Sequence, residues 1–341
     1  MSPGLVDLQV NGFAGVDLNS PALTPDDVLA VVRALARHGV TRFLPTVITA
    51  PYERMHETIS VIARARRIHR EVAGAAVGVH LEGPYISGRD GPRGAHDPRW
   101  VRAPDKTEFA ALAAAAEGAT IMVTVAPELK GALQLIRTGR AAGVVMAIGH
   151  TAADVDVVTA ATEAGASLST HLGNATEQLL PRHANVINAQ LAEDRLCATF
   201  IADGHHVPPH VLRTYLRAKG ISRSILVSDA TAAAAAPPGR YRLGELELTV
   251  GEDRIVRHPH RESFAGSALS LDDAVSNAAR WCAIELPDAI DMASLHPLRA
   301  LGMGLAQWSP DASDVDLVVA SLSAGRFRPI AAFRGRPSIG S

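Results

Sequence analysis

Short apolar runs alternate with longer amphipathic segments along most of this chain. The short runs are typical of buried strands, whereas the longer segments repeat apolar residues every three or four positions, as helices do. Eight strands are predicted, at Leu5–Val10, Thr41–Ile48, Ala76–Leu81, Thr120–Val125, Val144–Ile148, Ser167–Thr170, Cys197–Ala202 and Ser224–Val227. Helices are predicted between most of them, at Pro25–His38, Tyr52–Val72, Lys106–Glu117, Gly131–Ala142, Asp154–Ala164 and Pro209–Lys219.

This alternation predicts an α/β fold with a parallel sheet, and eight rounds of it favour a closed (β/α)8 TIM barrel over residues 4–305. An open doubly wound sheet is the alternative. It is less favoured because no Gly-x-Gly-x-x-Gly motif follows the first strand.

The pattern changes after the eighth strand. Residues 237–256 alternate between apolar and polar, which predicts a β-hairpin inserted into the barrel. Two more helices are predicted at Leu271–Ile284 and Asp291–Leu305. Residues 306–341 are expected to be the remnant of a small β-domain, with exposed strands at 314–319 and 327–333 that pair with the 237–256 hairpin or are covered at a subunit contact.

Composition narrows the class of protein further. The 341 residues carry a net charge of −2 and are 47% hydrophobic, so no general attraction to nucleic acid or to an anionic membrane is expected. The N-terminus is not a secretory signal, and no apolar run approaches about 18 residues. Because Cys197 and Cys282 lie in apolar surroundings in the sequence, we expect both to be reduced thiols. A soluble, cytoplasmic protein is therefore expected.

Polar residues with metal-binding side chains lie at the ends of three predicted strands. Glu82, His150 and His171 follow the third, fifth and sixth strands. Two imidazoles and one carboxylate form a typical catalytic zinc set, since a fourth position stays open for water or substrate, and the same set also suits Fe(II). The alternative is that each histidine is a hydrogen-bonded helix cap.

Asp229 ends the eighth strand and is a candidate general acid and base. Its alternative role is an N-cap or Asx turn. Gln9 lies on the first strand, where a second metal would call for a pair of histidines. An amide is a poor ligand beside imidazole, so one divalent metal ion per chain is expected, with zinc ahead of iron.

Several short motifs together resemble those of the N-acetylglucosamine-6-phosphate deacetylase family of the amidohydrolase superfamily. The resemblance runs from Pro3 to about Leu305. The motifs are Asp7-Leu-Gln-Val-Asn-Gly12, His80-Leu-Glu-Gly-Pro84, Gly149-His150, Thr170-His-Leu-Gly-Asn-Ala175, Ala202-Asp-Gly-His-His206, Ser228-Asp-Ala-Thr231 and Gly266-Ser-Ala-Leu269.

The resemblance implies a role for each matching residue. Glu82, His150 and His171 would be the metal ligands and Asp229 the general acid and base. His96 and His206 would contact the substrate, and Leu269 would form an apolar wall of the acetyl pocket. The sugar phosphate would be held by Asn174, by the amide of Ala175, and by Arg182 reaching into the neighbouring site of a homodimer.

The implied reaction is removal of the N-acetyl group from N-acetylglucosamine 6-phosphate or a close N-acyl amino sugar phosphate, with His96 or His206 helping to stabilise the oxyanion. Alternatives are an amidohydrolase for another small N-acyl substrate and a catalytically silent barrel used for binding. Two departures matter. The family typically begins with roughly 50 residues of β-structure, so this small domain is expected to lack its N-terminal half. The sequence after Ala175 also differs from the family pattern.

Overall fold

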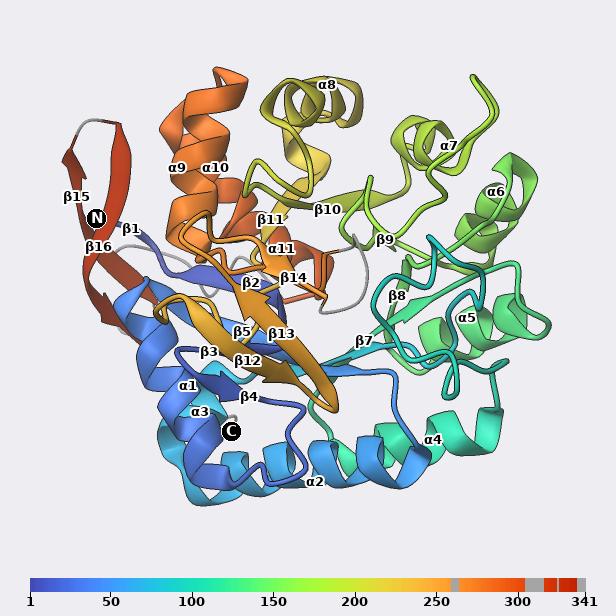
Figure 1. Cartoon of the computed structure of the whole chain (residues 1–341), viewed down its shortest axis with the longest axis horizontal. Helices are drawn as coiled ribbons and strands as arrows, with labels where there is room; N and C mark the ends of the chain where they lie inside the picture. The colour runs from blue at the N-terminus through green and yellow to red at the C-terminus, as the bar shows by residue number, and fades with distance from the viewer. Residues whose placement is uncertain (259–263, 304–315, 324, 336–341) are drawn as a thin grey trace.

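The computed structural model describes residues 1–258, 264–303, 316–323 and 325–335. At its centre lies a parallel sheet of eight strands in the order β11-β10-β9-β8-β7-β6-β5-β2 (Figure 1). These strands are β2 (Leu5–Val10), β5 (Val40–Ile48), β6 (Gly78–Glu82), β7 (Thr120–Val125), β8 (Val145–Ile148), β9 (Leu168–Ser169), β10 (Cys197–Ile201) and β11 (Ser224–Val227).

The first and last strands of this sheet meet. Val10 forms a parallel bridge with Ala230, and the Asn11 N–H donates to the Ala230 carbonyl at 2.8 Å. This contact closes the sheet at its carboxyl end, so the predicted (β/α)8 barrel is confirmed.

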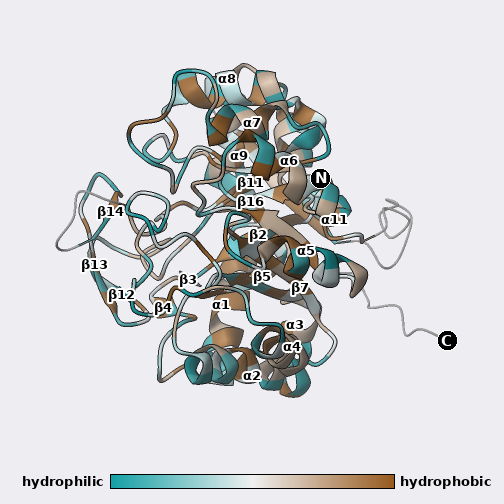
Figure 2. Ribbon diagram, turned by 90° about the vertical axis from the view of Figure 1, so that its right-hand side faces the viewer, coloured by the Kyte–Doolittle hydropathy of each residue, from teal (hydrophilic) through white to brown (hydrophobic). Residues whose placement is uncertain are grey.

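Helices surround the barrel, as Figure 1 shows. They are α1 (Pro25–Arg37), α2 (Tyr52–Ile68), α3 (Arg70–Ala75), α4 (Lys106–Ala115), α5 (Ala132–Ala141), α6 (Val155–Ala164), α7 (Val186–Ala192), α8 (Pro209–Lys219), α9 (Leu271–Cys282), α10 (Leu286–Met292) and α11 (Leu295–Ala300). The central strands are mostly hydrophobic, whereas the outer helices carry both hydrophobic and hydrophilic residues (Figure 2). The core therefore lies between the strands and the inner sides of the helices.

Some element boundaries differ from those predicted. The helix predicted at Tyr52–Val72 is divided into α2 and α3, because His69 adopts an extended backbone with φ −116° and ψ 110°. Where a helix is predicted at Asp291–Leu305, α10 ends at Met292 and α11 spans Leu295–Ala300, and residues 304 and 305 lie outside the described residues. The short helix α7 was not predicted.

Three small sheets lie outside the barrel in the described part of the chain, and they are separate from one another. Strands β12 (Gly239–Leu243), β13 (Leu246–Val250) and β14 (Val256–Arg257) form one antiparallel sheet. The tail strands β15 (Leu317–Ser323) and β16 (Arg326–Phe333) form another sheet with β1 (Ser2–Pro3). A last pair, β3 (Gly12–Phe13) and β4 (Val16–Asp17), forms a small hairpin beside the barrel.

Pairing of the tail with the 237–256 hairpin, one of its two expected arrangements, is therefore wrong for the described residues, whereas cover at a subunit contact stays a prediction. Val318 and Phe327 of the tail are buried in the main hydrophobic core, whereas Leu248 and Val256 belong to a small separate cluster. Burial thus holds the tail against the barrel helices, where Ser2 and Pro3 are its neighbours.

No helix in the described part of the chain is long and apolar enough to cross a membrane. Cys197 and Cys282 are both free thiols, as predicted.

Candidate metal centre and active site

A cavity of about 770 Å³ opens where the carboxyl ends of the barrel strands meet. Glu82 is the last residue of β6, and His150 and His171 each lie two residues beyond the ends of β8 and β9. All three line this cavity and are buried. Parallel strands all point their carboxyl ends at the same face of a barrel, which brings residues distant in sequence together there.

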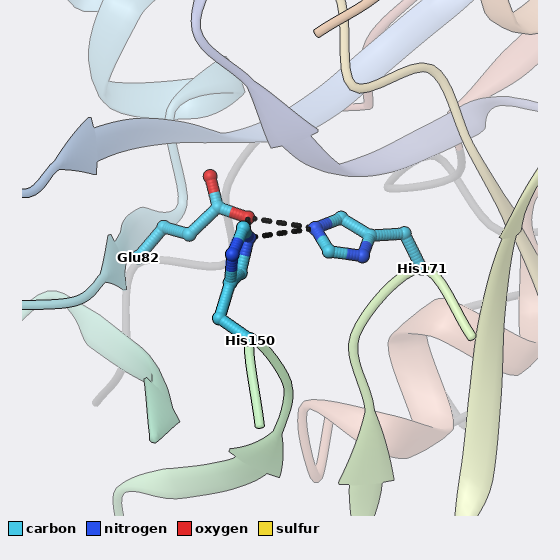
Figure 3. Close-up of side chains that lie close together, drawn as sticks. All are labelled: Glu82, His150 and His171. Carbon is cyan, nitrogen blue, oxygen red and sulfur yellow. Dashed lines mark hydrogen bonds and ion pairs between the residues drawn. The ribbon is translucent and has the colours of Figure 1, made fainter. Parts of the chain in front are cut away.

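The three side chains converge on one point, as Figure 3 shows. The Nε2 atoms of His150 and His171 lie 3.2 Å and 3.0 Å from the same Glu82 oxygen, Oε1. The two Nε2 atoms lie 3.1 Å apart. Ligands of a tetrahedral zinc ion with bonds of about 2.0–2.1 Å are roughly 3.3 Å apart, so this spacing fits such an ion.

The hydrogen-bonding chemistry of the set also favours a cation. His150 Nδ1 lies 2.9 Å from the Pro92 carbonyl oxygen, which can only accept, so Nδ1 carries the proton. In a neutral imidazole Nε2 then presents a lone pair, and this lone pair faces an oxygen of Glu82 and the Nε2 of His171. Facing lone pairs repel unless a positive charge lies among them. The donor set therefore fits a divalent metal ion.

Glu82 is held in its ionised form. Burial raises the pKa of Glu82, but the neighbouring His150 and His171 side chains outweigh it and hold that pKa well below its ordinary value. Gln9 Nε2 donates to the same oxygen, Oε1, at 2.7 Å. Gln9 therefore supports the carboxylate from the first strand of the barrel.

Four of the candidate residues share an uncommon backbone conformation. The φ values of His150, His171, Ala175 and Asp229 are 50°, 29°, 48° and 50°, in the left-handed region that favours glycine. Such conformations persist only where the surrounding structure enforces them, and they gather at functional sites.

Asp229 lies next to this cluster and lines the same cavity. Asn11 Nδ2 donates to Asp229 Oδ1 at 2.7 Å. Burial, together with the negative charge of Glu82, raises the pKa of Asp229 to about 8, against the opposing effect of the Asn11 hydrogen bond. A divalent cation beside Glu82 would lower this pKa and favour the carboxylate.

Two further histidines predicted from the sequence reach the cavity. The His96 ring lies edge-on to His150, with centroids 4.5 Å apart. Burial lowers the pKa of His96 to about 3, so this imidazole stays neutral. His206 Nδ1 lies 2.6 Å from Asp203 Oδ2, and its ring lies 4.9 Å from that of Phe264.

The residues expected at the phosphate and acetyl ends do not all lie together. Asn174 and Ala175 line the cavity. Arg182 is exposed and does not line the cavity of its own chain. Leu269 lines a different cavity of about 250 Å³, and its N–H donates to Ser267 Oγ at 3.0 Å. Its expected place in an acetyl pocket stays a prediction.

Sequence reasoning missed two residues of the site. Asn11 contacts Asp229, and Asp203 contacts His206. Both lie within motifs already noted, Asp7–Gly12 and Ala202–His206, so the motifs contained the signal. Which of their polar residues face the cavity depends on the fold.

A family model described as Amidohydrolase family matches residues 1–306 of the chain. The chain is 37% identical over 304 residues to an N-acetylgalactosamine-6-phosphate deacetylase of Escherichia coli, covering 89% of this chain and 78% of that protein. It is 34% identical to an N-acetylglucosamine-6-phosphate deacetylase of Homo sapiens, covering 94% and 79%.

A comparison with solved structures points to the same family. The fold is similar to that of N-acetyl-D-glucosamine-6-phosphate deacetylase from Mycobacterium smegmatis, with a TM-score of 0.87 and 34% identity, covering 98% of this chain and 85% of that one. A mutant of that enzyme, equally similar in fold, was solved in complex with N-acetyl-D-glucosamine-6-phosphate.

Proposed function

This chain belongs to the amidohydrolase family and, within it, to the N-acetylglucosamine-6-phosphate deacetylases, and we propose that it hydrolyses the N-acetyl group of an amino sugar 6-phosphate to acetate and the free amine. The observation that carries the proposal is the convergence of Glu82, His150 and His171 beside Asp229 in one cavity. That arrangement combines a metal-binding donor set with a buried carboxyl group that can exchange a proton.

We assign one divalent ion per chain to Glu82, His150 and His171, with zinc preferred because two imidazoles and a carboxylate are a common catalytic zinc set. When bound, the ion would polarise the acetyl carbonyl and acidify a water molecule. Gln9 and the Pro92 carbonyl would hold Glu82 and His150 in the orientation that binding needs.

Asp229 takes the proton of the attacking water and later gives it to the nitrogen of the departing amine. His96 is neutral and buried, His206 is held by Asp203, and both line the cavity. We propose that they face the developing oxyanion. Both imidazoles can donate a hydrogen bond to that oxygen.

The identity of the sugar is a separate part of the proposal. Relatives named for N-acetylglucosamine 6-phosphate and for N-acetylgalactosamine 6-phosphate are both more than a third identical to the chain. N-acetylgalactosamine 6-phosphate is therefore the second candidate substrate. Comparing kcat/KM for the two sugar phosphates decides between them.

The phosphate end combines Asn174, the Ala175 amide and Arg182. We propose that Arg182 serves the active site of a second chain in a homodimer, because it is exposed and does not line its own cavity. A guanidinium suits bidentate binding of phosphate. A cytoplasmic location completes the proposal, since the free thiols of Cys197 and Cys282 suit a reducing compartment.

The experiment that tests the phosphate site compares N-acetylglucosamine with its 6-phosphate on the wild type and on Arg182→Ala. We expect the wild type to prefer the phosphorylated sugar and the variant to lose roughly 10- to 100-fold of that preference. Equal kcat/KM for both sugars on the wild type would contradict a phosphate site. Mixed dimers of Arg182→Ala and Asp229→Asn chains should regain activity if the arginine acts across the interface.

A further inference from the structure

Asn11 is fixed at the point where the barrel closes. Its N–H donates to the Ala230 carbonyl at 2.8 Å, and its own carbonyl accepts from the Leu18 N–H at 2.9 Å. Both bonds use main-chain atoms, so the side chain is free for another purpose while its origin is held. That side chain is buried and lines the active-site cavity.

The amide nitrogen of Asn11 is committed to Asp229. Nδ2 lies 2.7 Å from Asp229 Oδ1. In the metal-bound protein Asp229 is a carboxylate and can only accept hydrogen bonds, so the nitrogen of the amide faces it and the oxygen faces elsewhere. Gly266 packs closely against this pair, since a Cβ there would lie 3.1 Å from the Asp229 carbonyl oxygen and 3.8 Å from Asn11 Nδ2. One oxygen of Asp229 is thus anchored, and the other is left for proton exchange.

The amide oxygen of Asn11 has no partner within the protein. Three buried side-chain atoms of the described cavity-lining residues lack one, namely Asn11 Oδ1, His96 Nδ1 and His171 Nδ1. A ring nitrogen can donate or accept according to its tautomer, whereas an amide oxygen can only accept. A buried acceptor that lines a cavity without a partner calls for a donor on the ligand.

We propose that Asn11 links the general base to the substrate, holding Asp229 through Nδ2 and accepting the amide N–H of the substrate through Oδ1. The inference rests on the proposed function, because the substrate must then be an amide. The scissile nitrogen carries the one hydrogen-bond donor at the bond that breaks. Asp229 must deliver a proton to that same nitrogen, so the nitrogen must lie near Asp229 and hence near its neighbour Asn11.

The test compares an amide with an ester. N-acetylglucosamine 6-phosphate carries the N–H, whereas the 2-O-acetyl ester of glucose 6-phosphate lacks it. The ratio of kcat/KM for amide over ester is measured on the wild type, Asn11→Leu and Asn11→Ser. Comparing this ratio between proteins cancels the greater intrinsic reactivity of the ester.

We expect the ratio to fall by about tenfold or more in both Asn11 variants, because leucine has no acceptor and the serine hydroxyl is too short to replace Oδ1. Turnover of both substrates should fall as well, since Asp229 loses its anchor. The acidic limb of the kcat/KM profile should move to higher pH, because the Asn11 hydrogen bond lowers the pKa of Asp229. The metal content should stay at the wild-type level.

Asn19 provides a matched control. It is also a buried asparagine that lines the cavity, but it bonds to the backbone, donating to the Thr46 carbonyl at 2.9 Å and accepting from the Ile48 N–H at 3.0 Å. Asn19→Leu should lower stability and leave the amide-to-ester ratio unchanged. An unchanged ratio in folded Asn11 variants would overturn this inference alone, whereas a wild type that hydrolyses neither compound would overturn the proposed function.

Discussion

Two layers of buried polar side chains lie inside the barrel, and they differ in how their groups are paired. The metal-ligand layer consists of Glu82, His150 and His171. The inner layer, one step nearer the amino ends of the strands, consists of Thr46, His80, Thr124 and Thr170.

The polar groups of the inner layer form hydrogen bonds with one another. His80 Nε2 lies 2.7 Å from Thr124 Oγ1, which lies 2.7 Å from Thr170 Oγ1. A hydroxyl both donates and accepts, so a proton can lie in each of these contacts. Burial lowers the pKa of His80 to about 4, which keeps its ring neutral. These side chains therefore need no ligand to complete their hydrogen bonds.

The metal-ligand layer cannot satisfy itself in the same way. The His150 Nε2 lone pair faces the Glu82 carboxylate at 3.2 Å, because His150 Nδ1 carries the proton. The two layers are almost equally buried, so burial of polar groups does not by itself mark a functional site. The difference lies in the pairing, and pairing is what mutations can test.

The largest expected effect comes from removing one of the three side chains of the metal-ligand layer. His171→Ala leaves one imidazole and one carboxylate, so metal binding should weaken by more than about 100-fold, beyond what loss of an outer-shell partner costs. Deacetylation should fall to the level of metal-free protein. Elemental analysis after dialysis, with circular dichroism as a control for folding, checks this, and a fully loaded variant would contradict the ligand assignment.

The next largest effect separates metal binding from catalysis, and it concerns Asp229, which lies next to the metal-ligand layer. Asp229→Asn keeps the shape of the side chain but cannot take a proton, so kcat should drop by roughly 10²- to 10⁴-fold while metal is retained. Steady-state kinetics and metal analysis on one preparation measure both quantities. Near-normal turnover would mean that another group is the base.

A change in the inner layer should behave in the opposite way. Thr124→Val removes the hydroxyl between His80 and Thr170 and leaves buried partners unpaired, so the free energy of unfolding should fall by about 1–3 kcal/mol. Metal content and kcat should change little. Urea unfolding measures the loss, and Thr124→Ser, which keeps the hydroxyl, is the matched control. Loss of metal from folded Thr124→Val would contradict the claim that the inner layer supports stability and not metal binding.

The smallest expected effect concerns stability and pH in the metal-free protein. The pKa of Asp229 is raised to about 8 when folded, above the ordinary value of 3.8. The folded state therefore binds the proton more tightly, and this contribution to stability, full below pH 4, is lost as pH rises toward 8. Asp229→Asn lacks that loss, so its Tm should exceed that of the wild type by a few degrees at pH 8 and by less at pH 5. Added metal should reduce the difference, as thermal melts at both pH values would show.

Much of the barrel could be predicted because each buried parallel strand is a short apolar run. The convergence of Glu82, His150 and His171 followed from the common direction of those strands. The break between α2 and α3 at His69 could not be predicted, because apolar residues keep the spacing of a helix across it. The helix α7 could not be predicted, because its 7 residues are too few to show such a spacing. The pairing of Ser2–Pro3 with the tail depends on contacts between opposite ends of the chain.

The positions of individual side chains were harder to predict than the elements. Leu269 belongs to a matching motif, yet it lines a different cavity from the one that Glu82, His150 and His171 line. Asn11 lies in another matching motif, and only the closure of the barrel brings it to Asp229. Motifs indicate which segments meet, and tertiary contacts decide which atoms face the substrate.

The central claim is that one divalent ion, held by Glu82, His150 and His171, makes this protein a deacetylase. Its most direct test is a titration of metal-free protein with zinc, followed by elemental analysis and by acetate release from N-acetylglucosamine 6-phosphate. Activity should rise in proportion to bound zinc and level off at one ion per chain. Full activity without metal, or a rise that continues to two ions per chain, would contradict the account.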